Sequence, residues 1–146
     1  MPVVRNPQFN FKEGFCWNNV LNPLARLLKA KMKTKAVNDV GSMSLSSVIQ
    51  SVPNFYFVAL LNSNLMFDYY REYINCTVNI QINDIKQLPI VIPSEQQCEY
   101  IRPLFQRAVL LKKDIVSSGE SENYIQNELS KIELKIDNYV YELYHI

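Results

Sequence analysis

Residues 55–93 read FYFVALLNSNLMFDYYREYINCTVNIQINDIKQLPIVIP, and this stretch decides the fold class because its hydrophobic period changes partway along it. In the first half, apolar residues recur every three or four positions, as they do along one side of a helix. Pro53 stands just before this run, where the first turn of a helix tolerates a missing N–H group. The pattern predicts one amphipathic helix whose apolar stripe is made by Val58, Leu61, Leu65, Tyr69 and Tyr73.

The second half of the stretch has a period of two, which is typical of a half-buried strand. Apolar and polar residues alternate, so that one predicted face carries Val78, Ile80 and Ile82 and the other carries Thr77, Asn79 and Gln81. A further extended run, 88–92, contains Pro89 and is followed by Pro93. Because proline cannot donate to a β-ladder, this run is expected at a sheet edge or outside the sheet.

The N-terminal third offers two more strand predictions. Phe9 and Phe11 alternate before a possible turn at 12–14, and Phe15 and Trp17 alternate after it, which predicts a β-hairpin. Segment 22–35 admits two interpretations. Its Asn-Pro start and apolar spacing favour a helix that uses Asn22, Pro23, Leu24, Leu27, Leu28 and Met32. Strand periodicity is instead indicated by the alternating lysines Lys29, Lys31, Lys33 and Lys35.

The C-terminal third predicts two helices. Ser94 and Gln97 form a capping-box pattern directly after Pro93, and Ser117 begins a Ser-Ser-Gly sequence that should end the helix. The apolar seam of this helix consists of Ile101, Leu104, Ala108, Leu111 and Ile115. The next helix repeats the spacing with Ile125, Leu129, Ile132, Ile136, Tyr139 and Leu143. Two seams joined by a short turn predict an antiparallel helical pair.

These elements predict an α+β fold: a small mixed or antiparallel sheet with a packed helix, followed by an antiparallel pair of C-terminal helices. The 146 residues are 48% apolar, which is enough to bury one core. We place the α+β domain in residues 1–93 and the helical pair in 94–146. The helical pair is expected to serve as a connector, a docking element or a dimerisation element.

Composition excludes several classes of protein. No apolar run approaches the roughly 18 residues of a membrane span, and the N-terminus lacks the apolar core of a signal peptide, so a cytoplasmic location is expected. The three cysteines, Cys16, Cys76 and Cys98, are far apart, which argues against a disulfide framework and against a zinc site. They are expected to be reduced and mostly buried.

The net charge of +1 conceals an asymmetry between the two halves of the chain. Residues 1–60 carry seven Lys or Arg and two acids, whereas residues 61–146 carry eight Lys or Arg and twelve acids. A basic half next to an acidic helical half would suit a surface for a polyanion beside a surface for a protein. Chance clustering of surface charges is the alternative.

Three segments in order carry a family resemblance: LLNSNLMFDYY at 60–70, TVNIQ at 77–81 and DIKQLPIVIPSEQQ at 84–97. Together they resemble the target-recognition domain found at the C-terminus of type IIG restriction-modification enzymes and in type I specificity subunits. GFCW at 14–17, the turn at 40–42 and KIELKIDNYVYELY at 131–144 stand in the order that this family leads us to expect. The resemblance implies a strand for the lysine-bearing half of segment 22–35, and we adopt it.

The resemblance also implies the function. A chain of this kind is expected to recognise duplex DNA in a restriction-modification system without being an enzyme by itself. S-adenosylmethionine and Mg²⁺ would belong only to catalytic domains outside these residues. The chain would be a C-terminal fragment of a larger enzyme or a half specificity subunit. Its expected partners are duplex DNA, a methyltransferase or endonuclease domain or subunit, and a second copy of itself.

Candidate DNA-binding residues come from two segments. In a strand, Lys29, Lys31, Lys33 and Lys35 would lie on one side about 6.6 to 7 Å apart, close to the spacing of phosphates along one DNA strand. The alternative is a solvated edge strand that resists aggregation. Asn79, Gln81 and Asn83 can each bind adenine through two hydrogen bonds, although they could equally be the solvent side of a strand. Aromatic residues of the first twenty are better explained by core packing than by base stacking.

A catalytic site is not indicated. His145 stands next to the chain end, and Asp68, Glu72 and Asp84 show no spacing typical of a metal or nuclease site, so surface positions are expected for them. Asn6, in an Asn-Pro-Gln-Phe sequence, only distantly resembles the catalytic turn of an amino-methyltransferase. The alternative function is a protein-interaction scaffold that uses the helical pair and binds no DNA. In both cases the seam residues are Ile101, Leu104, Leu111, Ile125, Leu129, Ile132, Ile136 and Leu143.

Overall fold

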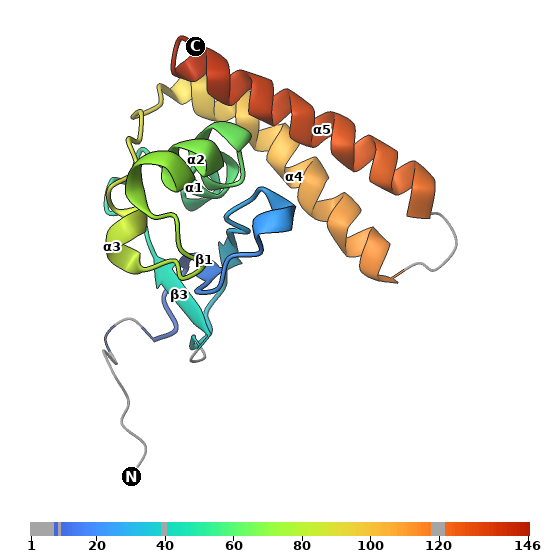
Figure 1. Cartoon of the computed structure of the whole chain (residues 1–146). Helices are drawn as coiled ribbons and strands as arrows, with labels where there is room; N and C mark the ends of the chain where they lie inside the picture. The colour runs from blue at the N-terminus through green and yellow to red at the C-terminus, as the bar shows by residue number, and fades with distance from the viewer. Residues whose placement is uncertain (1–7, 9, 39–40, 118–121) are drawn as a thin grey trace.

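A three-stranded antiparallel sheet and a pair of long helices organise the computed structural model, which describes residues 8, 10–38, 41–117 and 122–146. The strands are β1 (Gly14–Asn18), β2 (Lys31–Lys33) and β3 (Ser42–Leu45), in the order β2-β1-β3. Helix α1 (Asn54–Leu61) packs against β1 and β2, and the long helices α4 and α5 contact each other. The predicted α+β class is therefore confirmed (Figure 1).

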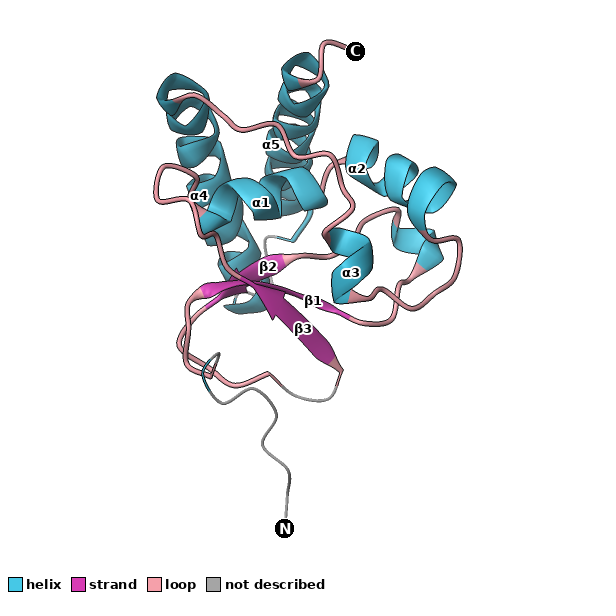
Figure 2. Cartoon of the chain, turned by 90° about the vertical axis from the view of Figure 1, so that its left-hand side faces the viewer, coloured by secondary structure: helices cyan, strands magenta, loops and turns pink. Residues whose placement is uncertain are grey.

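One face of the sheet is apolar because Phe15 and Trp17 of β1 both project to it, and Cys16 between them is buried on the other face. Phe15 and Trp17 are buried on the side of α1, where the Phe15 and Phe57 rings stack with their centroids 5.1 Å apart. Figure 2 shows α1, α2 and α3 above the sheet. The expectation that these two aromatic residues belong to the core is confirmed.

The helix predicted across 55–73 is interrupted. α1 ends at Leu61, and α2 (Asn64–Tyr69) begins after the Ser63 N-cap. The Ser63 hydroxyl accepts a hydrogen bond from the Met66 amide at 3.2 Å and donates one to the Leu60 carbonyl at 2.6 Å, so it ends one helix and begins the next. A π-helical turn, η3 (Tyr70–Ile74), follows. The single helix was wrong because apolar spacing continues across a break that one hydroxyl creates.

The strand predicted across 77–82 is also wrong. Only an isolated antiparallel bridge forms there, between Val20 and Asn79. A short helix, α3 (Ile82–Ile85), then begins because the Asp84 carboxylate accepts the Gln81 amide at 3.0 Å. The following run, 88–92, is extended but outside the sheet, as its prolines allow. The Tyr56 hydroxyl holds it by donating to the Val91 carbonyl at 2.8 Å.

The predicted N-terminal hairpin does not form. Phe11 has a positive φ of 58° and is 64% exposed, and its amide bonds to the Ala36 carbonyl instead of continuing a strand. Phe9 lies outside the described residues, as does Asn6. In segment 22–35 the helix alternative is wrong, because only the 3₁₀ turn η2 (Pro23–Ala25), capped by the Asn22 side chain, forms there. The strand adopted for the lysine-bearing half is confirmed for Lys31–Lys33, which make up β2.

The antiparallel helical pair is confirmed. α4 (Glu95–Ser117) starts at the predicted capping box, with Ser94 and Gln97 exchanging bonds of 2.8 and 3.2 Å, and α5 (Glu122–Leu143) returns beside it. The residues predicted for the seam of the helical pair are all buried or half-buried. Val140, which the pattern missed, is buried with them. Within the described ranges, no helix has both the length and the apolar character needed to cross a bilayer.

The sheet, α1 and the helical pair share one continuous core. Phe55 on α1 packs against Phe105 on α4 with 5.6 Å between ring centroids, and Asp137 on α5 accepts the Asn64 amide at 2.7 Å. Figure 1 shows α4 and α5 continuing to one side past the sheet. The core thus holds the helical pair at a fixed angle to the sheet.

Candidate nucleic-acid interface

The face of the sheet opposite α1, with its continuation at Val20 and Asn79, is the best candidate surface for a polyanion. Residues that pair across antiparallel strands project to the same face. Cys16 pairs with Lys31, Asn18 pairs with Ser42, and Val20 bridges to Asn79. We call the set Asn18, Val20, Lys31, Ser42 and Asn79 the outer face.

Burial alternates only from Trp17 onward, because Cys16 and Lys33, which lie on the same side as Lys31, are 6% and 7% exposed. Trp17 is 1% exposed and Leu21 is 4% exposed, whereas Val20 between them is 60% exposed and Asn18 is also exposed. Since neighbouring residues of an extended chain point to opposite sides, the outer face is solvent-accessible along the end of β1. It presents amide, hydroxyl and ammonium groups.

The four lysines do not form the predicted even row. Lys31 is exposed on the outer face, but Lys33 is only 7% exposed and its Nζ donates to the Lys12 carbonyl at 2.7 Å. Lys29 has a positive φ of 52°, so it departs from strand geometry, and Lys35 lies beyond the end of β2. Lys29 and Lys35 are exposed. Three cations, rather than four, are therefore available at the β2 edge.

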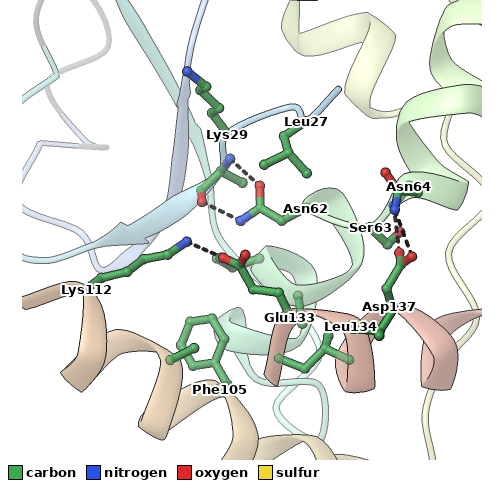
Figure 3. Close-up of a pocket in the computed structure, with 15 residues that line it drawn as sticks. Leu27, Lys29, Asn62, Ser63, Asn64, Phe105, Lys112, Glu133, Leu134 and Asp137 are labelled. Carbon is green, nitrogen blue, oxygen red and sulfur yellow. Dashed lines mark hydrogen bonds and ion pairs between the residues drawn. The ribbon is translucent and has the colours of Figure 1, made fainter. Parts of the chain in front are cut away.

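Asn62 at the end of α1 fixes the position of this edge. Its side-chain amide donates to the Ala30 carbonyl and accepts the Ala30 amide, both at 2.8 Å (Figure 3). This pair imitates a strand pairing at the start of β2. Nearby, Arg26 forms two hydrogen bonds of 2.9 and 3.2 Å to the Asp68 carboxylate. The backbone that carries Lys29 and Lys31 is therefore held at Ala30, between the two lysines, and the Arg26 side chain before them is bonded to Asp68.

The three predicted base-reading residues no longer share one strand face. Asn79 lies on the outer face, Gln81 precedes α3, and Asn83 lies within α3. All three are exposed. Since α3 contacts β3, Gln81 and Asn83 are displaced toward the edge of the sheet opposite β2. Of the amides predicted in this segment, the structure places only Asn79 on the same face as Lys31.

Asp84 is a bonded structural group and not a surface carboxylate as predicted. Its Oδ2 accepts hydrogen bonds from Asn75 at 2.8 Å, the Gln81 amide at 3.0 Å and the Tyr70 hydroxyl at 3.3 Å. Burial acts to raise the pKa of Asp84, but the bonds from Asn75, Gln81 and Tyr70 outweigh it, so the pKa lies below its ordinary value. Asp84 is therefore ionised at neutral pH.

A hollow of about 500 Å³ lies between the segment before β2, the end of α1 and the helical pair. Figure 3 shows its polar groups engaged with one another: Lys112 pairs with Glu133 at 2.9 Å, and Asn64 bonds to Asp137. The Lys29 side chain points away from that ion pair. No nucleophile with an adjacent base lines the hollow, so its residues hold elements together.

The apolar seam of the helical pair is buried in the core of the same chain. Ile132 and Ile136 on α5 are buried, as are Ile101 and Leu111 on α4. Leu104 is partly buried against the same core. A dimer of this chain would therefore need residues other than the predicted seam.

Cys16 and Cys98 are buried, as expected, whereas Cys76 is exposed. Asp68 and Glu72 are exposed, as expected, and so is His145. Among the residues that the structure describes, no three His, Cys, Asp or Glu side chains gather as they would around a metal ion.

Sequence reasoning missed Asn18 and Ser42. The alternation of β1 beyond Trp17 was a usable signal for Asn18, but the hairpin prediction stopped at Trp17. Ser42 could not be found in this way, because it reaches the outer face only through its pairing with Asn18. The chain matches no protein-family model, no curated protein and no solved structure.

Proposed function

We propose that this chain is a non-catalytic module that recognises duplex DNA through its outer face, as part of a restriction-modification system. One observation carries the proposal: Lys29, Lys31 and Lys35 are exposed and form no ion pair with any described residue, whereas Lys112 and Lys131 each form one. The backbone of Lys31 is nevertheless paired with β1, and that of its neighbour Ala30 is bonded to Asn62. The chain therefore presents unpaired positive charge on a rigid edge.

The chemistry of the outer face suits a duplex. Ammonium groups neutralise phosphates and supply affinity that does not depend on sequence. Asn18 and Asn79 supply paired donors and acceptors of the kind that read base edges in the major groove. None of the five residues of the outer face is acidic, so no carboxylate among them would repel the DNA backbone.

The helical pair supplies the second part of the proposal. Its seam is used internally, and its other side is free to dock on a methyltransferase or endonuclease domain or subunit in the cytoplasm. Leu110, Val116, Tyr124 and Leu134 on these helices are all more than half exposed. Cleavage or methylation, with S-adenosylmethionine and Mg²⁺, would take place on that partner.

A salt titration tests the DNA-binding part. Wild-type protein should bind random-sequence duplex at about 50 mM salt, with log affinity falling linearly against log salt. The triple variant Lys29→Ala, Lys31→Ala, Lys35→Ala should bind more weakly and lower the slope by about 2 to 3, since each phosphate contact contributes about 0.9. Lys33 is left in place because it is buried, so the fold is preserved.

The matched control replaces three exposed lysines that lie on or beside helices, Lys86, Lys113 and Lys135, by Ala. It has the same net charge as the edge variant and should keep most of the wild-type slope. Equal losses in both variants would show that total charge, not the β2 edge, causes binding. Absence of any binding at about 50 mM salt would overturn the proposal.

A protein-interaction scaffold is the second candidate. It is favoured by the same four exposed apolar residues of the helical pair, Leu110, Val116, Tyr124 and Leu134. In that case the lysines would only keep an edge strand soluble. The salt titration separates the two functions, because a scaffold of this kind should show no salt-dependent affinity for duplex.

A further inference from the structure

The segment 75–80 is a loop held by many hydrogen bonds. The Asn75 side chain makes four of them: its Nδ2 donates to the Asn79 carbonyl at 2.9 Å and to Asp84 at 2.8 Å, and its Oδ1 accepts the Thr77 amide and hydroxyl at 2.8 and 2.7 Å. Arg71 donates to the Thr77 carbonyl at 2.8 Å. The loop is thus closed around one asparagine side chain.

The far side of the loop is bonded to the end of β1. Leu21 donates its amide to the Val78 carbonyl at 2.6 Å, and the Ile80 amide donates to the Asn19 carbonyl at 2.8 Å. Together with the bond from Asn75 to the Asn79 carbonyl, residues 78, 79 and 80 each have a backbone group engaged. The backbone of Asn79 is therefore held from both sides.

The Asn79 side chain is the group that this arrangement leaves available. It is exposed, lies on the outer face beside Val20, and forms no hydrogen bond with the described residues. A side chain on a backbone fixed in advance loses little further freedom when it binds, so its interactions contribute fully to affinity and selectivity.

We propose that Asn79 reads an adenine in the major groove through two hydrogen bonds, and that Asn75 is the positioning residue that holds it. This inference rests on the proposed function and names its specificity-determining residue. An asparagine amide matches adenine because its carbonyl accepts from N6 and its NH₂ donates to N7. Gln81 and Asn83 have the same chemistry but lie toward the β3 edge, away from Lys31.

The test is selection from a randomised duplex library followed by sequencing, at one fixed salt concentration. Wild-type protein should enrich a motif that contains an adenine position, with about 5- to 150-fold preference over the other bases. Asn79→Ala should lose the preference at that position alone. Its affinity for random duplex and its salt slope should remain those of the wild type, because no phosphate contact is removed.

The positioning role of Asn75 has a separate readout. Asn75→Ala should lower the preference at the same adenine position, and adding Asn79→Ala to it should cause no further loss. A merely structural role would instead weaken binding to all sequences equally and leave the preference intact. Thermal melting of each variant shows that the molecule tested is folded.

Asn83→Ala is the matched control, since Asn83 is an exposed asparagine of the same segment. It should keep the wild-type motif. A wild-type motif that survives Asn79→Ala unchanged, or one that Asn83→Ala abolishes, overturns this inference and leaves the proposed function standing. Failure of the wild-type protein to bind any duplex overturns both.

Discussion

The two faces of the small sheet belong to the same strands but differ in burial and in polarity. On the side of α1, Phe15 and Trp17 are buried among aromatic and aliphatic side chains. On the outer face, Asn18 and Lys31 are exposed and fixed only through their backbone. Buried and exposed side chains therefore lie on opposite sides of the sheet at these positions, so we expect that stability and the proposed binding can be changed separately.

The largest effect that tests this separation is expected from two adjacent residues. Trp17→Ala should reduce the free energy of unfolding by about 3–5 kcal/mol, because it removes a large buried side chain. Asn18→Ala should change it by less than about 0.5 kcal/mol. Urea denaturation monitored by circular dichroism measures both. Similar losses for the two variants would show that the outer face also belongs to the core.

Trp17→Phe sharpens this result. The Trp17 Nε1 is buried without a hydrogen-bond partner among the described residues. Phenylalanine keeps much of the apolar area and removes that unsatisfied donor, so its cost should be well below that of alanine.

The next effect compares two lysines on the outer side of β2. Lys33→Ala should cost about 1–3 kcal/mol, because it leaves the Lys12 carbonyl without its bond from Nζ in a part-buried position. Lys31→Ala should cost less than about 0.5 kcal/mol and should instead weaken DNA binding. The same denaturation experiment, paired with the salt titration, checks both. A neutral Lys33→Ala would mean that this buried ammonium does not hold the edge.

Some elements of the fold could be predicted from the sequence and others could not. The helical pair was predictable because its seam, from Ile101 to Leu143, repeats over two long segments and packs largely on itself. The strand predicted at 77–82 failed because alternation is only a local signal. In the folded chain, the Asp84 carboxylate accepts the Gln81 amide and starts a helix there instead.

The candidate site was predictable to a similar extent. Of the predicted lysine strand only Lys31–Lys33 forms, and Lys31 is exposed as expected. The burial of Lys33 depends on the Lys12 carbonyl, and the edge position depends on Asn62, 32 residues from Ala30. Such partners come from the tertiary fold and leave no periodic trace in the sequence.

A smaller effect is expected at the base of the helical pair, where buried residues again fix the shape. The Tyr144 hydroxyl accepts the Val91 amide at 3.2 Å and donates to the Pro89 carbonyl. Tyr144→Phe should cost about 0.5–1.5 kcal/mol and speed hydrogen exchange at the Val91 amide. Tyr73→Phe, on a side chain that is 67% exposed, is the control and should change neither.

The smallest effect is expected from a change of pH, and it concerns only buried tyrosine hydroxyls. Burial raises the pKa of Tyr56, Tyr70 and Tyr144 above the ordinary phenol value. A phenol whose folded-state pKa is raised stabilises the fold below its unfolded pKa of about 10, and this contribution is lost as pH rises toward the folded pKa. The melting temperature should therefore fall more steeply above about pH 10 than below it. Tyr144→Phe should reduce that fall, whereas Asn18→Ala should not, because Asn18 does not titrate. An equal fall in both variants would mean that Tyr144 is not shielded in the folded state.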